Sequence, residues 1–168
     1  MLLYGSDTLD AYALLRRGLL DGYGLETLPT IQKTAGGKPY FPARPDIHFN
    51  VSHSGKFALC CVDETPVGAD IERIVPRRDT LPRYVFSPAE FAYYKEQGGD
   101  WATFYRLWTC KESVVKQRGD GIFPPSAAAI PLPPAQKLGE LYFQSYEGEG
   151  FSAAVCALKP PPSRIFWV

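Results

Sequence analysis

The sequence has no excess of charge of either sign and no long apolar run. Eighteen lysines and arginines balance eighteen aspartates and glutamates, so the net charge gives no reason to expect nucleic acid or an anionic membrane as a partner. No apolar run approaches the length that crosses a membrane. The first ten residues lack a basic segment followed by an apolar stretch, so we expect no signal peptide. These absences predict a cytoplasmic protein.

Cysteine and histidine are also scarce. None of the four cysteines belongs to a C-x-x-C pair, and the adjacent Cys60 and Cys61 are poorly placed to bridge each other. Unpaired cysteines of this kind usually act as small buried apolar residues, in proteins of a reducing compartment. The two histidines, His48 and His53, make a thin set of soft ligands, which argues against a zinc site.

The chain is long enough to bury a core without disulfides. Its 168 residues correspond to one domain, or to two small halves that share one core. Apolar residues at helical spacing predict a first helix over 7–20, with Asp7 as its N-cap. A helix followed by a hairpin is predicted twice along the chain, which suggests two related halves.

Three further helical segments follow in the second half. Ser87 and Glu90 have the spacing of a capping box and predict a helix start there. The longest helix is expected over 101–118, and Gly119 would end it. The segment 81–86, LPRYVF, is expected to form a helical turn.

The predicted strands form two hairpins. Residues 56–63 and 67–74 are separated by a short break and indicate one hairpin. Residues 140–158 indicate two strands around the turn EGEG. A proline-rich connection over 123–134 precedes them, and the tail over 159–168 is expected to be extended.

The stretch VGADIE carries two acids on one face of its strand. Because side chains alternate along a strand, Asp70 and Glu72 point the same way, about 7 Å apart. Close carboxylates repel unless a cation lies between them, and hard oxygen ligands suit Mg²⁺. An exposed strand face with two solvated acids would show the same pattern.

The stretch WTCKESVVKQ places an aromatic residue, an acid and a base on one helix face. Trp108, Glu112 and Lys116 lie at positions i, i+4 and i+8. An ordinary surface pair of Glu and Lys has this spacing, but Trp108 argues that the face is not simply solvated. An acid and a base at the edge of a cleft could remove one proton and deliver another.

The stretch FNVSHSGK places Ser52 and His53 before Gly55, at the entry to an apolar run. Hydroxyls, an imidazole and close backbone approach at a glycine suit a phosphate, although a polar turn has the same composition. The absence of G-x-S-x-G around either serine argues against a hydrolase dyad. Lys38, in the loop GGKPY, is typical of a solvated lysine unless a site lies near it.

These motifs occur in the order GKPYF, HFNVSHSGK, VGADIE, FSPAEF and FYRLWTCKESVVKQRGDGI. From about Gly37 to Ile122 the chain resembles the 4′-phosphopantetheinyl transferase family, of the larger type that activates peptide and polyketide synthases. The segment GFSAAVCAL resembles the C-terminal strand of that family. The resemblance implies one α+β domain over 1–168, with two similar halves, about 1–75 and 76–168, arranged as an intrachain pseudodimer.

The resemblance implies a reaction and a role for each acid. Family members transfer 4′-phosphopantetheine from coenzyme A to a serine of an acyl or peptidyl carrier protein and release 3′,5′-ADP. By motif position, Asp70, Glu72 and Glu112 are expected to bind Mg²⁺, or Mn²⁺ in its place. Glu112 would accept the serine proton, and Lys116 would stabilise or protonate the leaving group. Asp70 is the third residue expected to take part in catalysis, beside Glu112 and Lys116.

The resemblance also implies contacts with both substrates. The residues expected to bind the coenzyme are Lys38, Ser52, His53 and Lys111. Carrier proteins usually present an acidic helix, and a basic loop that could meet it follows the metal-binding strand. The arginines of this basic loop are Arg73, Arg77, Arg78 and Arg83. A solubilising loop would carry the same charges. We expect a monomer that binds neither nucleic acid nor membrane.

Two other functions fit parts of the pattern. A non-catalytic relative would bind coenzyme A or a carrier protein without turnover, but it would not need three acids and Lys116. An unrelated metal-dependent phosphohydrolase would use the acids but not Lys38 and His53.

The chain also has a shorter N-terminus than the family, and Tyr12-Ala13 where the family has a basic residue followed by Ser or Thr. We therefore expect the adenosine end of the site to differ.

Overall fold

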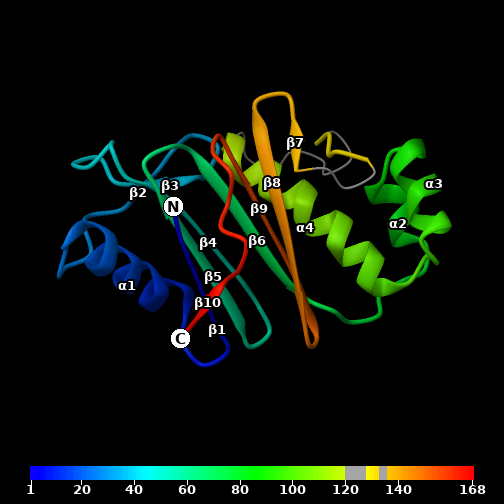
Figure 1. Cartoon of the computed structure of the whole chain (residues 1–168), viewed down its shortest axis with the longest axis horizontal. Helices are drawn as coiled ribbons and strands as arrows, with labels where there is room; N and C mark the ends of the chain where they lie inside the picture. The colour runs from blue at the N-terminus through cyan, green and yellow to red at the C-terminus, as the bar shows by residue number, and fades with distance from the viewer. Residues whose placement is uncertain (120–127, 133–135) are drawn as a thin grey trace.

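The computed structural model describes residues 1–119, 128–132 and 136–168 (Figure 1). Helices and antiparallel sheets combine, so the prediction of an α+β fold is confirmed. The helices are α1 (Ala11–Tyr23), α2 (Leu81–Val85), α3 (Pro88–Glu96) and α4 (Trp101–Arg118). The strands are β1 (Leu2–Ser6), β2 (Gln32–Lys33), β3 (Pro39–Tyr40), β4 (His48–Ser54), β5 (Phe57–Asp63), β6 (Val67–Arg73), β7 (Lys137–Leu138), β8 (Leu141–Gly148), β9 (Phe151–Ala157) and β10 (Phe166–Trp167).

Two four-stranded sheets form the centre of the molecule (Figure 1). The first has the strand order β10-β1-β5-β4 and the second the order β6-β9-β8-β7, while β2 and β3 pair separately. The pairing of β1 with β10 is parallel, and the other pairings are antiparallel. Helix α1 packs on the outer face of the first sheet and α4 on that of the second.

Alternation along the strands divides the core into layers. On β5, Leu59 and Cys61 face the space between the sheets, whereas Cys60 and Val62 face α1. Every residue of β5 and of β9 is buried. Both strands are covered on both faces, which explains why they are almost continuously apolar.

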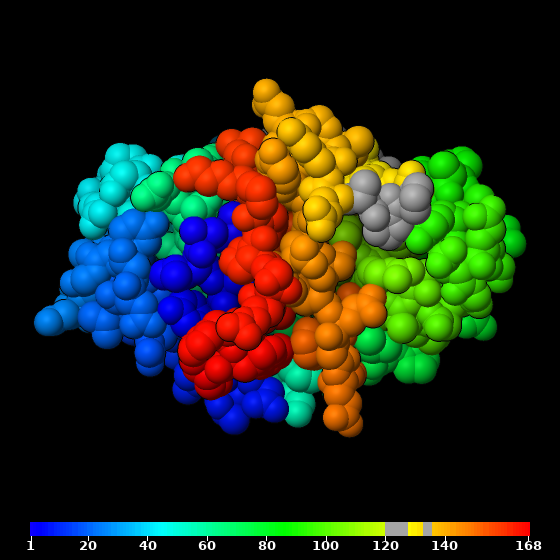
Figure 2. Space-filling view, in the orientation of Figure 1, coloured from blue at the N-terminus to red at the C-terminus, as the bar shows by residue number. Residues whose placement is uncertain are grey.

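The C-terminal segment lies over the junction between the sheets. In Figure 2 it runs, in red, between the N-terminal strand in blue and the β8–β9 hairpin in orange. Ile165 belongs to the core between the sheets. Tyr146 Oη donates a hydrogen bond of 2.6 Å to Pro162 O. The segment therefore joins the two sheets around one shared core.

Several local predictions are confirmed. Ser87 Oγ accepts from Glu90 N and Glu90 Oε2 accepts from Ser87 N, so α3 begins with the expected capping box. The longest helix ends at Gly119, whose φ of 74° lies in the left-handed region. The segment 81–86 contains α2, and 140–158 contains the β8–β9 hairpin.

The first helix begins later than predicted. Asp10 is its N-cap, since Asp10 Oδ1 accepts from the backbone N–H groups of Tyr12 and Ala13. Asp7 is not the cap, because Ser6 Oγ holds the intervening turn by accepting from the N–H groups of two later residues. The residues before this turn form β1, a strand that the sequence analysis missed.

The hairpin predicted from 56–63 and 67–74 is wrong. Both edges of β5 are already paired, with β1 and with β4, so β6 crosses to the second sheet and pairs with β9. The predicted connection over 123–134 lies mostly outside the described residues. The single domain and the equivalence of its two halves stay predictions. Within the described ranges, no helix is long and apolar enough to cross a membrane.

Candidate active site

The two sheets meet at their edge strands, β4 and β6, and polar side chains bridge them. Asn50 Oδ1 accepts a hydrogen bond of 3.0 Å from the backbone of β6. Two residues along β4, Ser52 Oγ donates to Asp70 Oδ1 at 2.8 Å. Two residues further, Ser54 Oγ donates to Glu72 Oε2 at 2.5 Å. Ser52 and Ser54 thus meet Asp70 and Glu72, because side chains two apart share a face of a strand.

Helix α4 packs closely across β6 at Gly68. A Cβ on Gly68 would lie 1.9 Å from Ser113 O and 2.3 Å from Gln117 N, both on the helix backbone. Only glycine therefore allows this approach. The approach brings the helix face that carries Glu112 and Lys116 onto the acids of β6.

Lys116 connects α4 to the junction of the sheets. Its Nζ donates to Asp70 Oδ1 at 2.6 Å and to Ser52 Oγ at 2.9 Å. The Asp70 side chain is 4% exposed, and its Oδ2 is buried with no hydrogen-bond partner among the described residues. Because an unpaired buried oxygen is costly, Oδ2 is a candidate ligand for a bound cation.

Glu72 and Glu112 add two half-buried carboxyl groups to Asp70. Burial raises the pKa of Glu112, and the charges of Asp70 and Glu72 raise it further, against the opposing charge of Lys116. Burial also raises the pKa of Glu72, again with a contribution from Asp70. A divalent cation among these acids would relieve their mutual repulsion.

The residue types suit Mg²⁺, which prefers carboxylate oxygens. Asp70 Oδ2 supplies an uncompensated oxygen, and two neighbouring carboxyl groups could neutralise a cation beside it. In the part of the chain that the structure describes, no three His, Cys, Asp or Glu side chains are close enough together to hold a metal ion. The acids would therefore have to draw together on metal binding.

A cavity of about 270 Å³ opens beside Lys116. Its described lining includes Tyr12 of α1, Lys33 of β2 and Lys38 of the β2–β3 loop. Three lysines thus lie around one space next to the acids. Such a positive lining favours an anionic ligand.

Lys38 also connects separate parts of the fold. Its Nζ donates to Val67 O at 3.1 Å and to Gln117 O at 2.7 Å, at the start of β6 and the last turn of α4. Burial lowers the pKa of Lys38 to about 8. The aliphatic part of its side chain packs on Gly119. Lys38 therefore both lines the cavity and fixes the end of α4.

Comparison with known proteins places these residues in a family. Residues 66–156, which include Asp70, Glu72, Glu112 and Lys116, match the family model of the 4′-phosphopantetheinyl transferase superfamily. A Bacillus subtilis protein named 4′-phosphopantetheinyl transferase is 35% identical, over 91% of this chain and 74% of its own length. The chain belongs to the 4′-phosphopantetheinyl transferase superfamily.

Two further relatives carry transferase names. The 4′-phosphopantetheinyl transferase Sfp of Bacillus subtilis (strain 168) is 36% identical, over 74% of this chain and 61% of its own length. The 4′-phosphopantetheinyl transferase AcpT of Salmonella typhi is 37% identical, over 81% of this chain and 71% of its own length. The chain thus spans between 61% and 74% of these transferases.

The structure buries Lys111, which the resemblance implied would contact the coenzyme. The Lys111 side chain is 0% exposed. Its Nζ donates to both carboxylate oxygens of Glu90, at 2.7 and 2.8 Å, and to Ala128 O at 2.7 Å. Lys111 therefore joins α4 to the start of α3 in the core of this transferase fold.

Ser52 and His53 occupy opposite faces of β4. Ser52 is buried and its hydroxyl bonds Asp70 and Lys116, so it orients these two residues rather than opening toward a ligand. His53 is exposed and shares a face with Val51, which lines the cavity. Asn50 and Ser54 were not among the predicted site residues, although their spacing of two from Ser52 was a signal.

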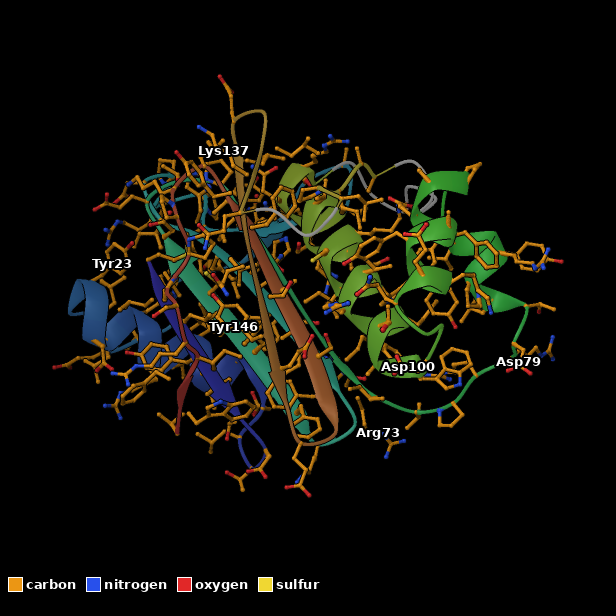
Figure 3. All side chains as sticks on the ribbon, turned by 45° about the vertical axis from the view of Figure 1, so that its right-hand side comes forward. Tyr23, Arg73, Asp79, Asp100, Lys137 and Tyr146 are labelled. Carbon is orange, nitrogen blue, oxygen red and sulfur yellow. The ribbon has the colours of Figure 1, made fainter. Side chains whose placement is uncertain are left out.

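The arginines of the basic loop extend from Arg73, the last residue of β6, to Arg83 within α2. Figure 3 shows Arg73 at the end of β6. Arg77 Nε donates to Tyr105 Oη at 3.2 Å, and Tyr105 Oη donates to Val75 O at 3.1 Å. The basic loop is therefore attached to α4, the helix that carries Glu112.

Proposed function

We propose that the chain transfers 4′-phosphopantetheine from coenzyme A to a serine of an acyl or peptidyl carrier protein and releases 3′,5′-ADP. One observation carries the proposal. The ion pair of Lys116 with Asp70 lies beside two carboxyl groups of raised pKa and opens onto a cavity lined by lysines. A phosphoryl transfer needs positioning and charge neutralisation more than covalent catalysis, and this arrangement supplies both.

Glu112 is the proposed general base. Burial and the charges of Asp70 and Glu72 raise the pKa of Glu112, which makes its carboxylate a better proton acceptor. Glu112, directly or through a water, would take the proton of the carrier serine. The serine oxygen forms a bond to the phosphorus that bears pantetheine, and the bond from that phosphorus to the departing 3′,5′-ADP breaks.

Lys116 is the proposed acid or charge partner for the departing group. The ammonium group of Lys116 has three N–H donors, and hydrogen bonds go from it to Asp70 and Ser52. It could transfer a proton to the leaving oxygen or stabilise its negative charge. Asp70 and Ser52 keep the ammonium group in place for this role.

Asp70, Glu72 and Glu112 are the proposed ligands of Mg²⁺, or of Mn²⁺ in its place. When bound, the metal would neutralise charge on the pyrophosphate. The unpaired Asp70 Oδ2 supports this assignment. Lys38 and His53 are proposed to provide further positive or donor groups for the phosphates of the coenzyme.

The basic loop is the proposed contact for the carrier protein, which would present an acidic helix to it. Its attachment to α4 through Arg77 and Tyr105 supports a position near Glu112. The alternative function is a module that binds coenzyme A or a carrier protein without turnover. The protein is proposed to act as a monomer.

The test is incubation with coenzyme A, Mg²⁺ and several apo carrier proteins, followed by intact mass measurement. We expect one phosphopantetheine to be added to a carrier, and EDTA to prevent the addition. Glu112→Gln should reduce transfer at least about 100-fold, in line with the contribution of a general base, with unchanged circular dichroism. Glu26→Gln, at an exposed position, is the matched control.

Two results would contradict the assignments. Wild-type transfer rates in Glu112→Gln would remove Glu112 from the mechanism. Binding of coenzyme A without a mass shift on any carrier would favour the non-catalytic module.

A further inference from the structure

Helix α1 presents one aromatic side chain to the cavity beside Lys116. Its core face carries Leu14, Leu15 and Leu19, which are at most 1% exposed, whereas Tyr12 is 41% exposed. The backbone N–H of Tyr12 is bound by the helix cap, Asp10, and its side chain lines the cavity. An exposed aromatic ring in a concave site offers a flat apolar face to a ligand.

The rest of the lining has the chemistry of a nucleotide site. Lys33, Lys38 and Lys116 supply positive charge, and none of the described lining residues is acidic. Gly36 and Gly37 leave the backbone open to a ligand. A positive, partly apolar space with one aromatic ring suits a ligand that combines phosphate with a planar base.

The size of the cavity limits which part of such a ligand it could enclose. Its volume is about 270 Å³, at the small end of ligand pockets, which span roughly 300–1,000 Å³. It therefore suits one end of an extended ligand. Lys116 lines this cavity and also forms an ion pair with Asp70, so the remainder of the ligand would extend toward Asp70.

We propose that Tyr12 stacks on the adenine ring of coenzyme A and that Lys33 contacts a phosphate of the same nucleotide. This inference rests on the proposed function for the identity of the ligand. Stacking on a base depends on the π-face and not on hydrogen-bonding atoms. The phenol hydroxyl should therefore matter little, and the ring should matter greatly.

Stacking at the adenine would act on binding and not on the chemical step. The base lies at the end of the coenzyme that does not react, so its contact is equal in the ground state and the transition state. Loss of the ring should raise KM for coenzyme A and leave kcat unchanged. A merely structural role for Tyr12 would instead lower the folded fraction and kcat together.

The test compares Tyr12→Ala, Tyr12→Phe and a control, Tyr84→Ala, by calorimetric titration with adenosine 3′,5′-bisphosphate and with coenzyme A. Tyr84 is 78% exposed on α2 and does not line the cavity. We expect Tyr12→Ala to weaken both ligands about tenfold, as for the loss of one base stack. Tyr12→Phe and Tyr84→Ala should bind within about twofold of wild type. Lys33→Met should weaken the bisphosphate and reduce the salt dependence of its binding.

Several outcomes would overturn the inference. These are wild-type affinity in Tyr12→Ala, equal losses in Tyr12→Ala and Tyr12→Phe, or no binding of the bisphosphate by the wild-type chain. Failure of the proposed function is separable. If the chain binds the bisphosphate in a Tyr12-dependent way but transfers nothing to any carrier, the transferase proposal fails and the stacking role stands.

Discussion

The buried ion pair of Lys111 and Glu90 allows a sharp test of whether Lys111 serves the core or the coenzyme. Lys111→Met keeps an unbranched apolar stem of similar length but removes the ammonium group. Glu90, 5% exposed in its side chain, would then keep its bond from Ser87 N but lose both bonds from Lys111. The carbonyl of Ala128 would lose its donor as well.

The expected cost follows from the burial of both partners. Removing one member of a buried ion pair leaves an uncompensated charge and costs about 3–5 kcal/mol. For a chain of this size, each kcal/mol lowers the melting temperature by about 2–4 °C. We therefore expect Lys111→Met to melt roughly 6–20 °C below wild type. Since domains are stable by about 5–15 kcal/mol, this single change removes a large part of the stability.

The assay is urea unfolding followed by tryptophan fluorescence, together with KM for coenzyme A measured well below the melting temperature. The control is the double variant Lys111→Met with Glu90→Gln. Glutamine keeps an oxygen for the capping bond from Ser87 but carries no charge. The double variant should therefore be more stable than Lys111→Met alone, because no buried charge is left unpaired.

The opposite result would restore the expectation from the sequence. If Lys111→Met costs less than about 1 kcal/mol, as expected for an exposed pair, while KM for coenzyme A rises strongly, Lys111 binds the coenzyme and is not part of the core. A large loss of stability with an unchanged KM in the folded protein supports the buried pair.

Two further predictions concern α4 and its neighbours. Gly68→Ala should destabilise the protein by about 1–3 kcal/mol, as overpacking does, and should reduce transfer, because the new Cβ would clash with Ser113 O on the backbone of α4. Unchanged melting and activity would show that the helix can move away freely. For Lys38, the pKa in the folded state is about 8, below its ordinary 10.5, so the unfolded state binds more protons between these values. The stability of wild type relative to Lys38→Met should therefore rise as the pH is raised from 8 to 10.5, and the gain should be lost as the pH falls back through 8. A difference in unfolding free energy that does not vary with pH would contradict the assignment.

The elements that could be predicted from the sequence depend on contacts over a few residues. The capping box of α3 joins Ser87 to Glu90, three positions apart, and the left-handed turn at Gly119 depends on glycine itself. The hairpin of β8 and β9 forms around a local turn. The order of the acids on their strand and helix was enough to indicate the family.

Other features depended on distant partners. Period and turn composition suggested that β5 and β6 form a hairpin, but β1 and β4 occupy both edges of β5. The strand β1 was missed because its identity depends on pairing with residues more than fifty positions away. The N-cap of α1 was misplaced because two aspartates lie near the helix start and only the hydrogen bonds distinguish them.

The sequence by itself indicated part of the donor set of the candidate site: three acids, Lys116 and Ser52. Tertiary structure alone decided how they are used. It paired Ser52 and Lys116 with Asp70, across 18 and 46 positions, and placed Tyr12 beside Lys116. It also drew Lys111 into the core onto Glu90, 21 positions away, because a buried ammonium group must find compensating oxygens wherever the fold supplies them. Residue type and periodicity indicate which chemistry a side chain can provide, but its partner is determined by packing between segments that are distant in the chain.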